Sequence, residues 1–231
     1  MLLKEIEMDL PYVRDINQEH VSEDDEKLNY ELNWKEKRRQ FQLMTRCMTS
    51  MIERTIPNIK TKDCWKILIE CVEKPTRKEI INLLGVYTVQ VPFDINLFWE
   101  MNSFQKKKYV VTKIREAMKI IVQYNYFNVE EIVNACNKVE NLNYVNEWYW
   151  NKPVNNKHVS AQIKVLHEVE KVTICVVFKD SIKESYKEII LVSDIPDERV
   201  YGKYLGKLEW ISVSTVRLSA KSGEYFIATY E

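Results

Sequence analysis

The chain has 231 residues, of which 45% are hydrophobic and 29% charged, and its formal net charge at pH 7 is zero. This apolar fraction is enough for a core in one large domain or two small ones. The balanced charge excludes a uniformly basic nucleic-acid-binding surface and leaves room only for a local basic patch. Four glycines and six prolines exclude long flexible linkers and glycine-rich phosphate loops.

The N-terminal segment is strongly acidic. Residues 1–26 carry nine acidic and two basic side chains, a net charge of −7, so the remainder carries +7. Residues 1–22 should be irregular or form a short extended piece, because Pro11 cannot sit inside a helix. The run Asp24-Asp25-Glu26 has two interpretations. The commoner one is a solvated start of a helix, which acidic residues favour; the other is an acidic arm that binds a basic partner.

The first half of the chain predicts helices. A long helix should run from Glu23 to Thr55, with Ser22 as its N-cap. Its apolar residues recur at roughly helical spacing: Leu28, Leu32, Phe41, Met44, Met48, Met51 and Ile52.

Shorter elements should follow the long helix. Helices are expected over residues 61–72 and 76–84, the second because Thr76 and Glu79 have the spacing of a capping box and Gly85 is placed to end it. A short strand should follow over residues 86–91, and Asp94 should open a helical turn.

A helix from Ser103 to Tyr124 is the clearest element in the chain, and another should run from about 128 to 139. The first of these carries six cations that could contact phosphates: Lys106, Lys107, Lys108, Lys113, Arg115 and Lys119. Tyr124, Tyr126 and Phe127 follow it and could stack on bases. However, three successive lysines spread over nearly a full helical turn and form no single stripe.

The character of the sequence changes after Asn141. An aromatic segment over 143–156 is expected to link the two halves. Beyond it, apolar and polar residues alternate, which is the pattern of β-strands. Five strands are predicted: 161–169, 172–178, 186–192, 208–218 and 225–230. Short turns between them indicate an antiparallel sheet. The predicted fold class is therefore α+β, with a mainly helical part over 1–142 and a small five-stranded antiparallel β part over 157–231.

The aromatic segment is a candidate binding site because Tyr and Trp are enriched at binding hot spots. Its central residues are Trp148, Tyr149 and Trp150. An extended backbone would send Trp148 and Trp150 to the same side. The alternative is a hinge packed between the two halves, which is favoured because exposed aromatic patches are rare.

Catalytic motifs are missing. There is no nucleophile elbow, P-loop, dinucleotide fingerprint or zinc-protease motif, and no catalytic residue is assigned. The five scattered cysteines form no zinc or disulfide pattern and are expected to be small buried hydrophobes. His167 beside Glu168 could serve a metal-independent nuclease or hydrolase, but neighbouring strand residues point to opposite faces, which favours a structural histidine.

These observations rank three functions. The leading prediction is a non-catalytic protein-binding protein, such as an inhibitor, immunity or adaptor protein of a bacterial or phage conflict system, which would use the acidic run or the aromatic segment. The second is a nucleic-acid-binding protein using the basic helix, and the third is a metal-independent hydrolase. No metal, cofactor or membrane partner is expected. Without a secretion signal or an apolar span the chain should be cytoplasmic, and the sequence does not specify an oligomeric state.

Overall fold

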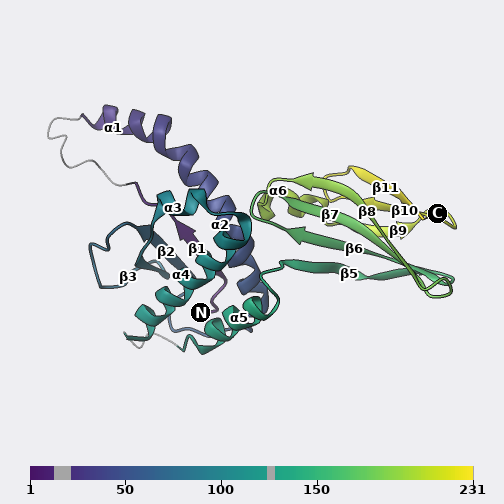
Figure 1. The fold of residues 1–231 in the computed structure, drawn as a ribbon, viewed down its shortest axis with the longest axis horizontal. Helices are drawn as coiled ribbons and strands as arrows, with labels where there is room; N and C mark the ends of the chain where they lie inside the picture. Colours follow the sequence, from purple (N-terminus) through teal and green to yellow (C-terminus); the bar gives the residue numbers. More distant parts are fainter. Residues whose placement is uncertain (13–21, 124–127, 231) are drawn as a thin grey trace. The chain divides into compact units, whose positions relative to one another are not determined.

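The computed structural model describes residues 1–12, 22–123 and 128–230. It divides into two compact units, Met1–Tyr144 and Val145–Glu231, which Figure 1 shows as a mixed helix-and-strand unit and an all-strand unit with a short helix. The α+β class is confirmed. The expectation of a sheet only in the C-terminal part is wrong, because the N-terminal unit contains a four-stranded sheet of its own, which includes the strand predicted over 86–91.

The sheet of the N-terminal unit is mostly parallel. Its strands are β1 (Glu5–Asp9), β2 (Lys66–Val72), β4 (Val86–Pro92) and β3 (Ile81–Leu83), in the order β1-β2-β4-β3. The first three are parallel to one another, and β3 pairs antiparallel with β4. The carboxyl ends of β1, β2 and β4 therefore lie at the same edge of this sheet.

Helices provide the other layer of the N-terminal unit. The long helix predicted from 23 to 55 is present as α1 (Glu23–Asn29), a π-helical turn η1 (Tyr30–Trp34) and α2 (Lys35–Thr55). α2 packs on β1, α4 (Ser103–Gln123) packs on β4, and α5 (Glu130–Asn141) packs on both helices. The short helix α3 (Ile95–Glu100) begins after β4, with Asp94 as its N-cap.

Two predicted helices are strands in the structure. Residues 66–72 form β2, in which Ile67, Ile69 and Cys71 are buried and alternate with partly exposed residues. The segment 76–84 contains the short strand β3, and the Thr76 N–H and hydroxyl donate to Gln90 Oε1 instead of forming a capping box.

The C-terminal unit is a sandwich of two antiparallel sheets. One contains β5 (Glu147–Asn156), β6 (Val159–His167), β7 (Val172–Asp180) and β8 (Ser185–Asp194) in sequence order. The other contains β9 (Lys207–Trp210), β10 (Thr215–Ser219) and β11 (Tyr225–Thr229), and the short helices α6 (Glu198–Tyr201) and η2 (Gly202–Tyr204) connect them. Buried side chains from both sheets share one core, as expected for face-to-face packing.

The C-terminal unit differs from its prediction in two ways. Most of the expected linker over 143–156 is strand β5, because its alternating aromatic residues complete the core of the sandwich. The expected strand 208–218 is two strands joined by a turn, so the described unit has seven strands instead of five.

Candidate functional site

The acidic run begins a helix that lies at the end of the N-terminal unit. Asp24 and Asp25 are exposed and Glu26 is half-buried. Ser22 caps the helix, because its Oγ accepts from the Asp25 N–H at 3.2 Å and donates to Asp25 Oδ2 at 2.7 Å. α1 buries none of its residues, and Figure 1 shows it extending past the sheet of this unit. We call residues 22–34 the arm.

Two leucines on the arm are exposed to solvent. Leu28 follows Asp24 by about one helical turn and is 57% exposed, and Leu32 is 71% exposed. Both were expected in the apolar face of the long helix, but the buried part of that face begins at Phe41. Leu28 and Leu32 therefore form an apolar surface next to Asp24 and Asp25.

The opposite side of the arm is attached to the body of the unit. The Tyr12 ring packs edge-on against Tyr30 and Trp34, with centroid distances of 5.8 and 5.9 Å, and Trp34 Nε1 donates to the Leu10 carbonyl at 3.2 Å. A hollow of about 620 Å³ lies over the end of the arm and the start of α2. The arm thus has a side that packs and a side that does not.

Most cations of the predicted basic helix, which is α4, are buried or paired within the N-terminal unit. Lys106, Lys107 and Lys113 are buried, with Lys106 Nζ 5.6 Å from the centre of the Phe98 ring. Arg115 donates to Glu140 Oε2 at 2.7 Å.

Of the six predicted cations, only Lys108 and Lys119 are exposed. Tyr124, Tyr126 and Phe127 lie outside the described residues. The structure does not gather these cations on one surface.

The aromatic segment lies on β5, and its two tryptophans share one side, as the spacing predicts. Both pack against the core of the sandwich, and Trp150 Nε1 donates to the Gly206 carbonyl at 3.2 Å. Tyr149 points to the other face and is 41% exposed. Tyr149 alone of the three is available as a surface residue.

His167 is fully buried between backbone and phenol groups. Its Nε2 lies 3.2 Å from the Pro196 carbonyl oxygen and its Nδ1 lies 3.3 Å from Tyr201 Oη. A carbonyl only accepts, so Nε2 carries a proton that it donates to Pro196, and Nδ1 is within hydrogen-bond distance of the Tyr201 hydroxyl. With both nitrogens engaged and no exposure, the imidazole has no access to a substrate. Glu168 follows the end of β6.

The cysteines are free and buried. Burial raises the pKa of the Cys64 and Cys136 thiols to about 11 and that of Cys175 to about 12, and it raises the pKa of Cys71 as well. These thiols are protonated at neutral pH, and a thiol without thiolate character is a poor nucleophile.

The described residues contain neither a candidate metal site nor a candidate membrane-spanning helix. Over 1–12, 22–123 and 128–230, no group of three or more His, Cys, Asp or Glu residues is placed to hold a metal ion. No helix in the same ranges is long and apolar enough to span a bilayer.

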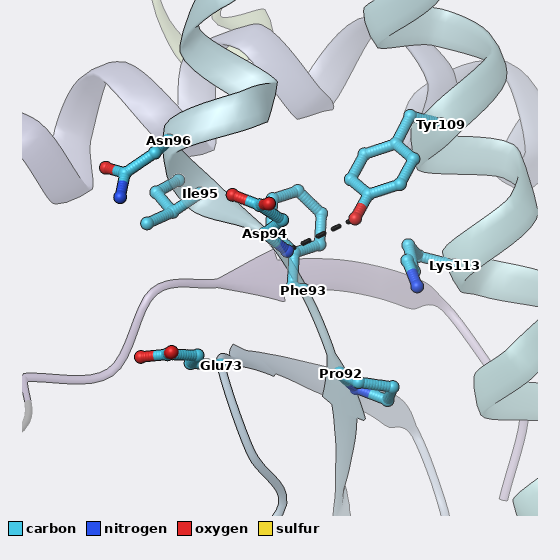
Figure 2. A pocket seen from close by; sticks show the side chains of 8 residues that line it. All are labelled: Glu73, Pro92, Phe93, Asp94, Ile95, Asn96, Tyr109 and Lys113. Atoms are coloured by element: carbon cyan, nitrogen blue, oxygen red, sulfur yellow. Dashed lines mark hydrogen bonds between the residues drawn. The ribbon is translucent and has the colours of Figure 1, made fainter.

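A pocket that the sequence did not predict lies at the carboxyl ends of β2 and β4. Its volume is about 500 Å³. Figure 2 shows Glu73 and Asn96 at one side, Tyr109 and Lys113 at the other, and Asp94 between them. The complete lining is Glu73, Pro92, Phe93, Asp94, Ile95, Asn96, Tyr109 and Lys113. Assigning β2 to a helix concealed this site, because only parallel strands bring residues 73 and 94 to one edge.

The geometry of the pocket is set by contacts within the N-terminal unit. The Asp94 N–H donates to Tyr109 Oη at 3.2 Å, and Asp94 Oδ1 accepts from the Leu97 N–H at 2.9 Å. Lys113 Nζ lies 5.1 Å from the centre of the Tyr109 ring and pairs with Glu116 at 2.9 Å. These contacts fix Tyr109 and Lys113 on one rigid helix.

Comparison with protein-family models, curated proteins and solved structures gives no match to this chain. The arm and the pocket are both places where polar and apolar groups lie together at the surface.

Proposed function

We propose that this chain is a protein-binding protein that docks its partner on the exposed side of the arm. The observation that supports this most directly is the exposed pair Leu28 and Leu32 beside Asp24 and Asp25, on a helix that buries none of its own residues. The inhibitor, immunity and adaptor roles predicted from the sequence are specific forms of this proposal.

The chemistry of the surface specifies the partner. Apolar side chains about one turn apart on a helix are the anchors of helix-in-groove recognition. Carboxylates beside them favour a groove with a basic rim, because complementary charge raises the association rate and disfavours acidic competitors. Glu31 is paired with Lys35 at 2.6 Å, whereas Glu23, Asp24 and Asp25 are exposed acids in the first turn of α1. The expected partner is a protein with an apolar groove bordered by Lys or Arg.

The two alternative functions have less support. Nucleic-acid binding would need exposed cations, and three of the six on α4 are buried while a fourth is paired with Glu140. A hydrolase using His167 would need an accessible imidazole, and this one is fully buried.

The test is affinity capture followed by kinetics. Tagged wild-type protein and two double variants, Asp24→Lys with Asp25→Lys and Leu28→Ser with Leu32→Ser, are used to capture proteins from host lysate. A partner of the arm should be retained by the wild type and lost by both variants. With that partner purified, the aspartate variant should lower the association rate about tenfold or more at low salt, and the leucine variant should chiefly raise the dissociation rate.

Glu130→Lys with Glu131→Lys is the matched control, because these adjacent acids occupy the first turn of α5 and are also exposed. It makes the same charge change at another helix start and should retain the partner. Equal retention by the arm variants, or no retained protein at all, would contradict the proposal.

A further inference from the structure

We propose that the pocket at the carboxyl ends of β2 and β4 binds a small zwitterion of the amino-acid class, with its ammonium group toward Glu73 and its carboxylate toward Tyr109 and Lys113. This inference is independent of partner binding by the arm. It rests on the complementary ends of the pocket, the unused bonding capacity of its polar groups, and its charge.

The end formed by Tyr109 and Lys113 has hydrogen-bond donors to spare. Tyr109 Oη already accepts from the Asp94 N–H, so its own hydroxyl proton is directed elsewhere, and a phenol has one such proton. Lys113 has three ammonium protons, of which the contact with Glu116 uses one. A carboxylate between these two groups would receive two charge-assisted hydrogen bonds, which are stronger than neutral ones.

The end formed by Glu73 and Asn96 has acceptors to spare. Within the described residues, neither the Glu73 carboxylate nor the Asn96 side chain has a hydrogen bond or ion pair, and Asp94 uses only Oδ1, to cap α3. An ammonium group has three donors, and the Glu73 carboxylate can accept from it. Figure 2 shows Asp94 and Asn96 on the upper side of the pocket, across from Glu73, where they add a second carboxylate and an amide.

The charge of the pocket selects between ligand classes. Its lining contains two carboxylates and one ammonium group, and that ammonium is already paired with Glu116. A phosphate would be repelled by the carboxylates, and a simple amine would leave the donors of Tyr109 and Lys113 unused. A zwitterion with no net charge satisfies both ends.

The apolar part of the lining fits the body of such a ligand. Pro92, Phe93 and Ile95 also line the pocket, and the Phe93 ring packs against Phe41 and Tyr109 at centroid distances of 5.3 and 4.8 Å. The volume of about 500 Å³ lies within the range for small-molecule sites. The edge where parallel strands end is also where open sheets of this kind bind ligands.

The test is a binding measurement by saturation-transfer and ¹⁵N-correlation NMR on the full chain. The probes are mixtures of the common L-amino acids, followed by the amine and the carboxylic acid that correspond to the best binder with one charged group removed. At least one amino acid should bind with a dissociation constant of about 1 mM or tighter and shift the amide resonances of residues 93–96. Both truncated analogues should bind about tenfold more weakly or worse.

Variants assign the two ends of the ligand. Glu73→Gln should weaken the amino acid about tenfold without weakening the amine-free analogue, and Tyr109→Phe should weaken the amino acid several-fold and more than it weakens the carboxylate-free analogue. Glu79→Gln is the control, because Glu79 is an exposed carboxylate in the same loop but does not line the pocket. No binding of any amino acid at about 10 mM, or binding that Glu73→Gln and Tyr109→Phe leave unchanged, would overturn the inference.

Discussion

The arm is mainly acidic and the helix α4 is mainly basic, and the fold places their charges in opposite ways. On α1 no residue is buried, and Asp24 and Asp25 face solvent. On α4 three lysines are buried and Arg115 is paired with Glu140. Lysine has a long aliphatic stem that packs well while its charged group reaches the surface. A run of charge in the sequence therefore does not by itself show whether the charged side chains are exposed or packed.

The largest expected effect is a difference in stability between buried and exposed apolar residues of the same long helix. Phe41→Ala should cost about 3–5 kcal/mol of unfolding free energy, because Phe41 is fully buried against Phe93 and Phe98. Leu28→Ala with Leu32→Ala should cost less than about 0.5 kcal/mol. Urea unfolding followed on resonances of the N-terminal unit measures both. A loss above about 1 kcal/mol for the leucine pair would mean that these side chains are packed and not free to dock a partner.

The second prediction compares the stability lost on removing buried lysines of α4 with that lost on removing exposed ones. Lys106→Ala with Lys113→Ala should destabilise the N-terminal unit by roughly 2 kcal/mol, because both stems leave buried positions and both ammonium groups leave aromatic rings. Lys108→Ala with Lys119→Ala removes the same charge from exposed positions and should change stability by less than about 0.5 kcal/mol. Equal effects of the two pairs, again read from urea unfolding, would show that the buried lysines do not contribute through packing.

The smallest expected effect is on the pKa of Glu140. The hydrogen bond from Arg115, together with its positive charge, lowers the pKa of Glu140 below its ordinary value of 4.5. A carboxyl with a lowered folded-state pKa contributes stability above its unfolded-state pKa and loses that contribution as the pH falls through the folded-state pKa. An NMR titration of the Glu140 carboxyl should therefore show a midpoint below 4.5, and Arg115→Met should move it back toward that value. An unchanged midpoint would mean that Arg115 is free in solution to contact another molecule.

The long helices and the alternating strands were predictable, because their apolar periods extend over many residues. The segment 64–72 was not, because its apolar residues satisfy two periods at once. Cys64, Ile67, Leu68 and Cys71 have helical spacing, whereas Ile67, Ile69 and Cys71 have strand spacing. For runs this short, periodicity does not separate the two structures, and pairing with β1 and β4 decides the outcome.

Gly85 does end an element, as predicted, but the element is a strand and not a helix. Glycine after an apolar run is typical of a helix end, but here Leu84 and Gly85, with φ of 51° and 81°, form the two-residue turn between β3 and β4. Hairpin turns with positive φ at both positions favour glycine for the same steric reason. A Cβ at Gly85 would also lie only 2.7 Å from Trp65.

The candidate sites were predictable in part. The acids of the arm were identified from the charge run, but Leu28 and Leu32 were assigned to the buried face. Leu28 lies thirteen positions before Phe41, which puts it roughly 140° away around an ideal helix, so its position could have been found by counting. The pocket depends on strands from distant parts of the sequence, and no local pattern indicates it.

The π-helical turn η1 gives the arm a property that its composition does not show. A π turn holds one residue more than an α-helical turn, so it rotates everything before it by roughly 100° about the helix axis. Removal of one residue between Tyr30 and Trp34 would make Asp24 and Leu28 face a different direction around the helix axis without changing either side chain. The direction in which Asp24 and Leu28 face, relative to α2, thus depends on one residue of this turn.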